Sequence, residues 1–208
     1  RLKQNKIKYE LLEEELKNSG EPQISTTDAD ARALLVQGQV VEVSYNIQAA
    51  VDSKHNLVVA THTINRNDKN ALGTIAKEAK ENLEVETCTV LVDKGYHNGR
   101  EIATCQQNNI TTIVAVPEQG KSNENGTQPG YFVSNFTYNK EENTYTCPQG
   151  QILTSTGRWH KKTGRTEESG YMFQKYRTAA CKACPVKDQC TSRKGGREID
   201  RSEYADAV

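Results

Sequence analysis

The distribution of apolar residues in the first half of the chain predicts two strands that pair with each other. Residues 40–51 and 56–64 form strand-like runs, and the polar stretch Asp52 to His55 separates them. A strand, a tight turn and a second strand in this order are typical of an antiparallel hairpin.

Helices and strands are then expected to alternate. Residues 70–83 carry apolar side chains at helical spacing, at Leu72, Ile75, Ala76, Ala79 and Leu83. Either Asn67 or Asp68 can cap this helix. A strand over residues 88–92, a helix over 99–108 and an apolar run over 111–116 follow. This order predicts an α/β fold with a mixed sheet and flanking helices over residues 40–117.

The segments on either side have a different pattern. Residues 1–39 predict a charged helix and a linker, and the helix has a short apolar stripe that needs a partner helix. Residues 118–144 form a polar linker that leads into an insertion. Residues 145–201 have scattered aromatic and basic residues, which predicts an irregular Cys-rich insertion with a poor core. Residues 202–208 are interpreted as the start of a C-terminal helix.

Charge indicates a partner only through its distribution. Lys plus Arg and Asp plus Glu both number 27, but residues 158–201 contain 12 basic and 5 acidic residues. Such a patch suits a polyanion such as DNA, although a solvated basic surface without a partner explains the count as well. The candidate DNA-binding residues are Arg158, Lys161, Lys162, Arg165, Arg193, Lys194 and Arg197.

No apolar run is long enough for a membrane span, and no signal-peptide pattern opens the chain. We therefore expect a cytoplasmic protein without a membrane partner. Because the chain begins at Arg1 without an initiator methionine, we interpret it as part of a longer protein.

Four of the six cysteines suggest a metal site. Cys147 lies in YTCPQG, and Cys181, Cys184 and Cys190 lie in CKACPVKDQC. Four thiolates in this arrangement predict a structural zinc site, in which His160 can replace one thiolate. Inert packed thiols and a redox CxxC pair are the alternatives. Cys88 and Cys105 are expected to be small core residues.

Asp93 ends the strand at residues 88–92, directly before a glycine turn. An aspartate at this position usually caps the next turn, and this structural interpretation also suits Asp52. If other carboxylates converge on Asp93, the cluster needs divalent cations, and oxygen ligands suit Mg²⁺ or Mn²⁺. Two such ions promote phosphodiester cleavage and strand transfer.

Four stretches together resemble one family. SYNIQAAVDSKHNLVVA, VLVDKGYHNGREI, YTCPQG and ACKACPVKDQC are similar, in this order, to bacterial insertion-sequence transposases with a DDE catalytic domain, in the subgroup with a Cys-rich insertion. The resemblance covers roughly residues 24–201. It implies an RNase H-like fold, DNA as substrate, catalytic Mg²⁺ or Mn²⁺, a homo-oligomer in the active complex and a nucleoid-associated, cytoplasmic location.

The resemblance carries over only one of the three metal-binding acids. Asp93 matches the second aspartate of the family, whereas the first aspartate is expected on an upstream strand and the glutamate in a later helix. Glu203 is not assigned as that glutamate. The RNase H-like sheet is thus expected to lack its first strand and last helix, and residues 1–208 alone are expected to be inactive. A non-catalytic, zinc-stabilised DNA-binding module and a stand-alone metal-dependent nuclease are the alternative functions.

Overall fold

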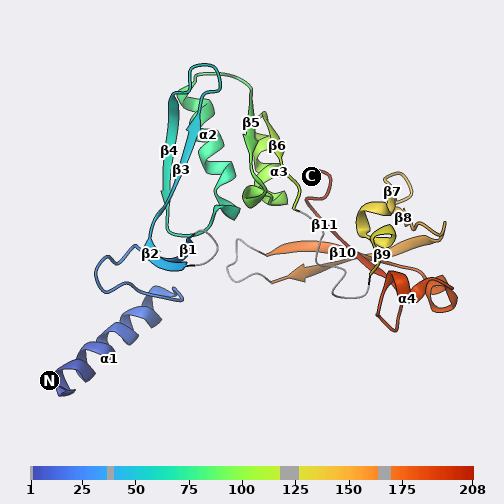
Figure 1. The fold of residues 1–208 in the computed structure, drawn as a ribbon, viewed down its shortest axis with the longest axis horizontal. Helices are drawn as coiled ribbons and strands as arrows, with labels where there is room; N and C mark the ends of the chain where they lie inside the picture. Colours follow the sequence, from blue (N-terminus) through green and yellow to red (C-terminus); the bar gives the residue numbers. More distant parts are fainter. Residues whose placement is uncertain (1, 37–39, 118–126, 164–169) are drawn as a thin grey trace. The chain divides into compact units, whose positions relative to one another are not determined.

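A computed structural model describes residues 2–36, 40–117, 127–163 and 170–208 (Figure 1). The chain divides into two compact units, Arg1–Ala115 and Val116–Val208. Of the candidate residues, Arg165 lies outside the described residues.

The first unit begins with an exposed helix, α1 (Leu2–Ser19), which has no buried residue. Two ion pairs at i,i+4 spacing stabilise it, Lys6 with Glu10 at 3.7 Å and Lys17 with Glu13 at 2.7 Å. The helix is therefore formed as predicted, and its need for a partner helix stays a prediction.

The strand predicted over residues 40–51 is divided in two. Its first part, β2 (Val40–Ser44), pairs with β1 (Arg32–Val36), which lies in the predicted linker. Its second part, β3 (Asn46–Val51), pairs with the next strand, β4 (Val58–Ile64). Tyr45 lies between β2 and β3, and its hydroxyl donates to the Asp28 carboxylate at 2.9 and 3.0 Å. The alternating pattern continues through Tyr45, so the sequence did not indicate this break.

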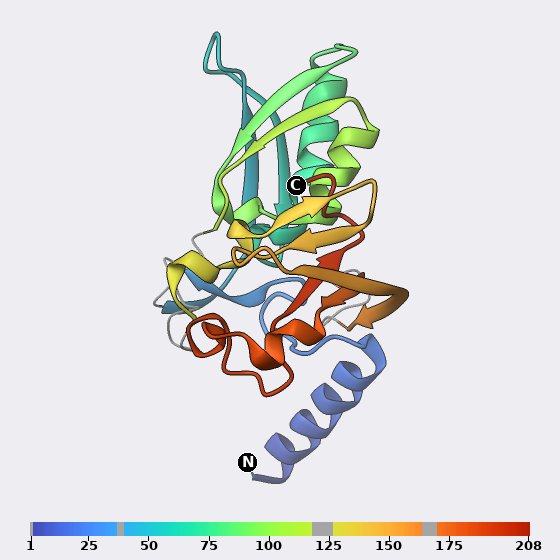
Figure 2. The same ribbon diagram turned by 90° about the vertical axis from the view of Figure 1, so that its right-hand side faces the viewer.

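The helices and the parallel strands agree with the sequence. The elements are α2 (Leu72–Asn82), β5 (Cys88–Val92), α3 (Gly99–Gln107) and β6 (Ile110–Val114). Strands β5 and β6 are parallel. Figure 2 shows α2 and α3 on the same side of the strands, where Ala60 of β4 packs against Ile75 and Ala79 of α2.

Among the described residues the strands of the first unit do not join into a single sheet, although the combination of an antiparallel and a parallel pair agrees with the predicted mixed arrangement. β3 pairs with β4 and β5 pairs with β6, as two separate two-stranded ladders. Each of β3 and β5 thus has one edge without a strand partner among the described residues. Ile47 of β3 is 68% exposed and Leu91 of β5 is 80% exposed, so apolar side chains remain uncovered on both ladders.

The second unit contains a regular antiparallel sheet, which corrects the prediction of an irregular insertion. Five strands pair in the order β11-β10-β9-β8-β7: β7 (Thr137–Asn139), β8 (Thr144–Thr146), β9 (Ile152–Lys162), β10 (Tyr171–Arg177) and β11 (Glu198–Ser202). The core consists of Phe136, Tyr145, Leu153, Tyr176 and Ile199. Most of these residues lie on strands and alternate with exposed positions, which is why aromatics that look scattered in sequence gather on one face.

Residues 202–208 do not form the start of a helix. They contain the end of β11 and a series of turns. The Glu203 amide donates to the Met172 carbonyl at 2.9 Å, and the Glu203 carboxylate accepts from the Met172 amide at 2.8 Å. These bonds attach the start of the turns to β10 at the position where a helix was expected.

Three cations surround Glu198, whose side chain is only 8% exposed. Lys175 and Arg193 approach its carboxylate at 2.9 and 2.7 Å, and Arg177 makes a third ion pair. Burial alone would raise the pKa of Glu198, but the three cations outweigh burial and lower the pKa to about 2.

Glu198→Gln is expected to lower the free energy of unfolding of the second unit by about 2–3 kcal/mol at neutral pH. Because the folded-state pKa is lowered, this stabilisation is complete above the unfolded-state pKa of 4.5 and is lost as the pH falls towards 2. Urea unfolding measured between pH 7 and pH 2.5 tests this. Glu141→Gln, at an exposed loop position, is the matched control. Equal unfolding free energies for the two variants at pH 7 contradict the expectation.

None of the helices in the described parts of the chain has the length and apolar character that a membrane crossing requires.

Candidate functional site

Asp93 lies directly after β5, where the strand passes into a short 3₁₀ helix, η2 (Lys94–Tyr96). Its Oδ1 accepts a hydrogen bond from the Gly95 amide at 2.7 Å, so Asp93 caps η2. The residue is exposed. The carboxylate is therefore held by its own turn, with Oδ2 left for another interaction. The capping role that the sequence offered and a ligand role are compatible.

Gly95 brings a second carboxylate into the neighbourhood of Asp93. A Cβ atom at position 95 would lie 2.9 Å from Asp93 Oδ1 and 3.4 Å from Asp68 Oδ2. Both carboxylates therefore approach the same glycine. A side chain at this position would displace the Asp93 carboxylate from its present orientation.

Asp68 belongs to η1 (Asp68–Asn70), the 3₁₀ helix that precedes α2. The sequence suggested Asn67 or Asp68 as the cap of the helix over residues 70–83, but α2 starts after Ala71 without a side-chain cap, and Asn67 instead caps η1 by accepting from the Lys69 amide. Asp68 Oδ1 instead accepts from Asn46 at 2.7 Å and from Gln48 at 2.9 Å. Asp68 begins a 3₁₀ helix and does not follow a strand directly, so the sequence did not indicate it as a neighbour of Asp93.

Gln48 connects Asp68 to the Asp93 turn. Its side chain is on β3, is 2% exposed, and donates to Asp68 while its Oε1 accepts from the Tyr96 hydroxyl. Burial raises the pKa of Tyr96, and the negative charges of Asp68 and Asp93 raise it further. Tyr96 therefore stays protonated and remains a hydrogen-bond donor over the ordinary pH range.

A second bridge joins the same two turns. Asn98 caps α3 by accepting from the Arg100 amide, and its Nδ2 donates to the Lys69 carbonyl at 2.9 Å and to Asn70 at 2.8 Å. Polar side chains thus connect η1 and η2 although β3 and β5 are not paired.

Asp52 lies in the hairpin turn between β3 and β4. Its Oδ2 accepts from the His55 amide at 2.7 Å and lies 2.9 Å from His55 Nδ1. The turn amides of His55 and Lys54 lower the pKa of Asp52. These contacts fit the structural interpretation that the sequence favoured for this residue.

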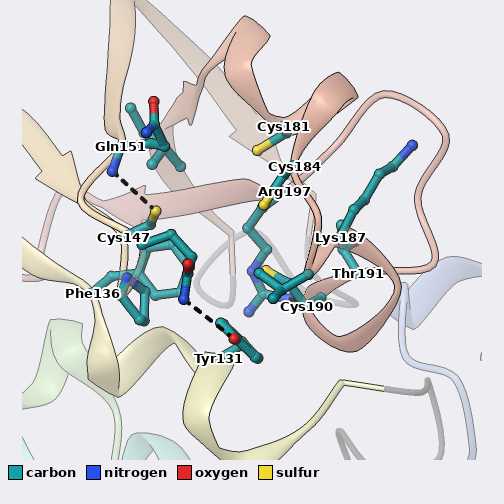
Figure 3. A pocket seen from close by; sticks show the side chains of 14 residues that line it. Tyr131, Phe136, Cys147, Gln151, Cys181, Cys184, Lys187, Cys190, Thr191 and Arg197 are labelled. Carbon is teal, nitrogen blue, oxygen red and sulfur yellow. Dashed lines mark hydrogen bonds between the residues drawn. The ribbon is translucent and has the colours of Figure 1, made fainter.

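The second unit brings Cys147, Cys181, Cys184 and Cys190 to the wall of one cavity of about 30 Å³ (Figure 3). This volume is large enough for one ion or one water molecule. Cys147 follows β8, Cys181 lies in η7 (Ala179–Ala183), and Cys190 ends the short helix α4 (Lys187–Cys190). Burial raises the pKa of the Cys190 thiol, Arg197 opposes this increase, and the other three cysteines add to it.

Local backbone geometry fixes the walls of this cavity. The Gln151 amide donates to Cys147 Sγ at 3.3 Å, which fixes the position of this side chain at the cavity wall. Gly196 has a φ of 93°, and a Cβ there would lie 2.3 Å from Cys181 Cβ. A glycine is required at this position because the two chain segments approach so closely.

The chemical types of the candidate ligands suit metal ions, but the positions of these side chains do not form a closed metal site. Four thiols around one cavity are the ligand set of structural zinc, and a carboxylate oxygen suits Mg²⁺. Among the described residues, no group of three or more His, Cys, Asp or Glu side chains is arranged to hold a metal ion. His160 is not among the cavity's lining residues; its ring centroid lies 5.6 Å from that of Phe173.

The two remaining cysteines lie in the first unit, as expected. Cys105 on α3 is 0% exposed and belongs to the core, and burial raises its pKa to about 11. Cys88 is half-buried on β5.

The basic residues predicted to bind DNA have different surroundings. Arg158, Lys161 and Lys162 are exposed on β9, and Trp159 between them is 47% exposed. Lys194 is exposed as well. Arg193 forms an ion pair with Glu198. The Arg197 guanidinium lies 5.8 Å from the Phe136 ring centroid and donates to the Cys190 carbonyl at 3.4 Å, so it contributes to the packing around the cysteines.

Comparison with known families gives one match. The sequence pattern of the family described as "Transposase DDE domain" matches residues 22–183, which is more than half of the chain. Searches among curated proteins and among solved structures return no match.

Proposed function

The chain belongs to the family of transposase DDE domains, and from this membership we propose that Asp93 is one of the acids that hold the catalytic metal. The family implies DNA cleavage and strand transfer during transposition. The observation that carries the proposal is the position of Asp93: it is exposed, it follows a parallel strand directly, and Gly95 supports one of its two oxygens. Ligand sites in α/β sheets lie at this end of the strands.

A further strand between β3 and β5 supplies the first aspartate in this proposal. Such a strand gives both open edges a hydrogen-bonding partner and runs parallel to β5. Its carboxyl end would then lie beside Asp93, because parallel strands end at the same edge of a sheet. Ile47 on β3 and Leu91 on β5 have exposed apolar side chains. They support the proposal that a further helix covers these side chains and supplies the glutamate, the third metal-binding acid of the family. In this proposal the described residues provide only Asp93 of the three acids, and we expect residues 1–208 to be inactive by themselves.

The metal is Mg²⁺ or Mn²⁺, and when bound it activates the attacking oxygen and stabilises the leaving oxygen. Within this chain, the turn around Gly95 orients one metal ligand, the Asp93 carboxylate. The Gly95 amide fixes Oδ1 of Asp93, and the lack of a side chain at position 95 leaves this carboxylate orientation unobstructed. Holding the carboxylate in one orientation reduces the entropy lost when the metal binds.

The experiment that tests this function is a cleavage assay with the full-length protein and a DNA duplex that carries an end of the element. Mg²⁺-dependent nicks that leave 3′-hydroxyl groups, followed by joining to a target duplex, support it. Absence of nicking under all metal conditions by the folded protein contradicts it.

In the second unit, the proposal is a structural Zn²⁺ held by Cys147, Cys181, Cys184 and Cys190. Support comes from the common cavity that the four side chains line and from the amide that donates to Cys147 Sγ. The segment of η7 and its C-terminal cap supplies two of the four thiolates, Cys181 and Cys184, from a single turn. Metal binding then adds stability to a unit of fewer than 100 residues.

This unit also suits a DNA-binding role, in which side chains of β9 contact the DNA. Such a role is possible in a catalytic and in a non-catalytic protein. Exposed Arg158, Lys161 and Lys162 on β9 favour binding to phosphates, with Trp159 as a stacking residue. The proposed contacts also include Arg165, Arg193, Lys194 and Arg197. The active complex is proposed to be a homo-oligomer on element ends and target DNA, in a bacterial, nucleoid-associated setting.

Lys161→Ala is expected to make the negative slope of log binding constant against log salt concentration shallower by about 0.9, because one phosphate contact is lost. Fluorescence anisotropy with duplex DNA between 50 and 300 mM salt measures the slope. Lys140→Ala, an exposed position in the turn after β7, is the matched control and should leave the slope unchanged. Identical slopes for wild type and Lys161→Ala would exclude Lys161 from the phosphate contacts.

A further inference from the structure

Three side chains form a continuous polar chain that ends at the Asp93 turn. Asp68 of η1 accepts from Gln48 of β3 at 2.9 Å, and Gln48 accepts from the Tyr96 hydroxyl of η2. Tyr96 is three residues after Asp93, and its amide donates to the Asp93 carbonyl at 3.3 Å. The chain therefore connects β3 to the turn that holds the candidate ligand.

The middle of this chain is buried, so its hydrogen bonds are not exchanged freely with water. Gln48 is 2% exposed, and its Nε2 has two acceptors, Asn46 Oδ1 at 2.9 Å and Asp68 Oδ1 at 2.9 Å. With Oε1 occupied by Tyr96, the amide is fully used. Breaking one bond leaves a buried polar group without a partner, which fixes the geometry more strongly than a surface contact would.

Backbone pairing does not provide this connection in the described residues. β3 pairs with β4 and β5 pairs with β6, and no ladder joins the two pairs. Helix packing sets the distance between the ladders, but side-chain hydrogen bonds are more directional than apolar contacts. The orientation of η2 towards β3 thus depends on Gln48 and its two partners.

We propose that Asp68, Gln48 and Tyr96 are positioning residues for the catalytic site: together they fix the Asp93 turn against β3 so that its carboxylate faces the other metal ligands. This inference rests on the proposed function of Asp93. The Asp68 carboxylate acts through Gln48, and its negative charge beside Gly95 also adds to the attraction of a cation at Asp93.

The test uses the full-length protein and measures the Mg²⁺ concentration that gives half-maximal DNA cleavage. Tyr96→Phe removes one hydroxyl and keeps the ring, and it is expected to raise this concentration about tenfold, the effect typical of groups that orient a metal ligand. At saturating Mg²⁺, most of the cleavage rate should return. The matched control is Tyr45→Phe, which removes a tyrosine hydroxyl that donates to the Asp28 carboxylate in the same unit and should leave the Mg²⁺ dependence unchanged.

Gln48→Glu adds a pH readout that loss of packing alone would not produce. The new carboxyl group would face Asp68, and two close carboxylates share a proton at low pH but repel each other when both are charged. The ratio of wild-type to variant cleavage rates is therefore expected to rise from pH 6 to pH 8.5. Thermal melts of each variant at each pH separate this effect from unfolding.

The outcomes distinguish the inference from the proposed function. If Asp93→Asn abolishes cleavage but Tyr96→Phe and Gln48→Glu leave both the Mg²⁺ dependence and the pH profile of wild type, the positioning role is wrong and the function stands. If Asp93→Asn cleaves DNA normally, the proposed function fails and the positioning role fails with it.

Discussion

Asp93→Asn is expected to reduce Mg²⁺-dependent DNA cleavage and strand transfer by the full-length protein by at least about 1,000-fold, on the order of 4 kcal/mol of lost transition-state stabilisation. The change removes a negative charge and one strong oxygen ligand while the side-chain size stays the same. Asparagine can still accept from the Gly95 amide, so the cap of η2 and the fold should survive. Cleavage assays with an element-end duplex, together with a thermal melt, measure both effects.

The matched control for this prediction is Asp52→Asn. Asp52 also accepts a backbone hydrogen bond within a turn of the first unit, but its partner is His55 in the β3–β4 hairpin. Its substitution should leave cleavage within about twofold of wild type. If both aspartate variants lost activity to the same extent, the loss would reflect the fold, and the ligand role of Asp93 would be contradicted.

Removal of zinc is the second change with a large expected effect. Protein purified under reducing conditions should contain about one Zn²⁺ per chain, and a chelator or Cys184→Ser should remove it. The second unit should then lose cooperative unfolding, because zinc binding contributes on the order of 10 kcal/mol to small metal-dependent folds. Elemental analysis and near-ultraviolet circular dichroism of the tyrosine-rich core report on these two effects.

Cys88→Ser is the control for the cysteine proposal, because Cys88 lies on β5 in the other unit. Its zinc content should equal that of wild type. Metal-free wild-type protein with an intact second unit contradicts the zinc site and leaves the four thiols as packed side chains. A disulfide between Cys181 and Cys184 that forms reversibly in its place would favour the redox alternative.

Local patterns allowed the first unit's helices and parallel strands to be predicted from the sequence. Helical spacing from Leu72 to Ala79 corresponds to the buried face of α2, and the apolar run over residues 88–92 corresponds to β5. Each of these elements buries one side against a neighbour. Its apolar residues therefore recur at the regular spacing of a helix or a strand, which can be seen in the sequence. At the break between β2 and β3, Tyr45 is hydrogen-bonded to Asp28, seventeen positions earlier, and no local pattern contains such a contact.

The sheet of the second unit could not be predicted from the sequence for a related reason. Its sheet has short strands, and Tyr145, Leu153 and Tyr176 come together only through pairing of β8, β9 and β10. A local register shift between Gln174 and Tyr176 interrupts the alternation along β10. Tyrosines with their hydroxyls at the edge of the core also look polar in a hydropathy pattern, although the rings are buried.

In the candidate site, the sequence identified Asp93 but not the residues around it. A strand that ends on an aspartate before a glycine turn is a local signal. Asp68 and Gln48 are 25 and 45 positions earlier, and only the fold brings them to the same turn. Gln48 did give a weak signal, since it is a polar residue on the inward-facing side of a strand, where a partner is required.

The most direct measurement of the central claim is an anomalous-scattering map from crystals of the full-length protein bound to DNA and Mn²⁺. We predict a Mn²⁺ peak about 2.1 Å from a carboxylate oxygen of Asp93, shared with a carboxylate from the neighbouring strand. A fully occupied Mn²⁺ peak at the scissile phosphate, with Asp93 outside its ligands, would contradict the claim.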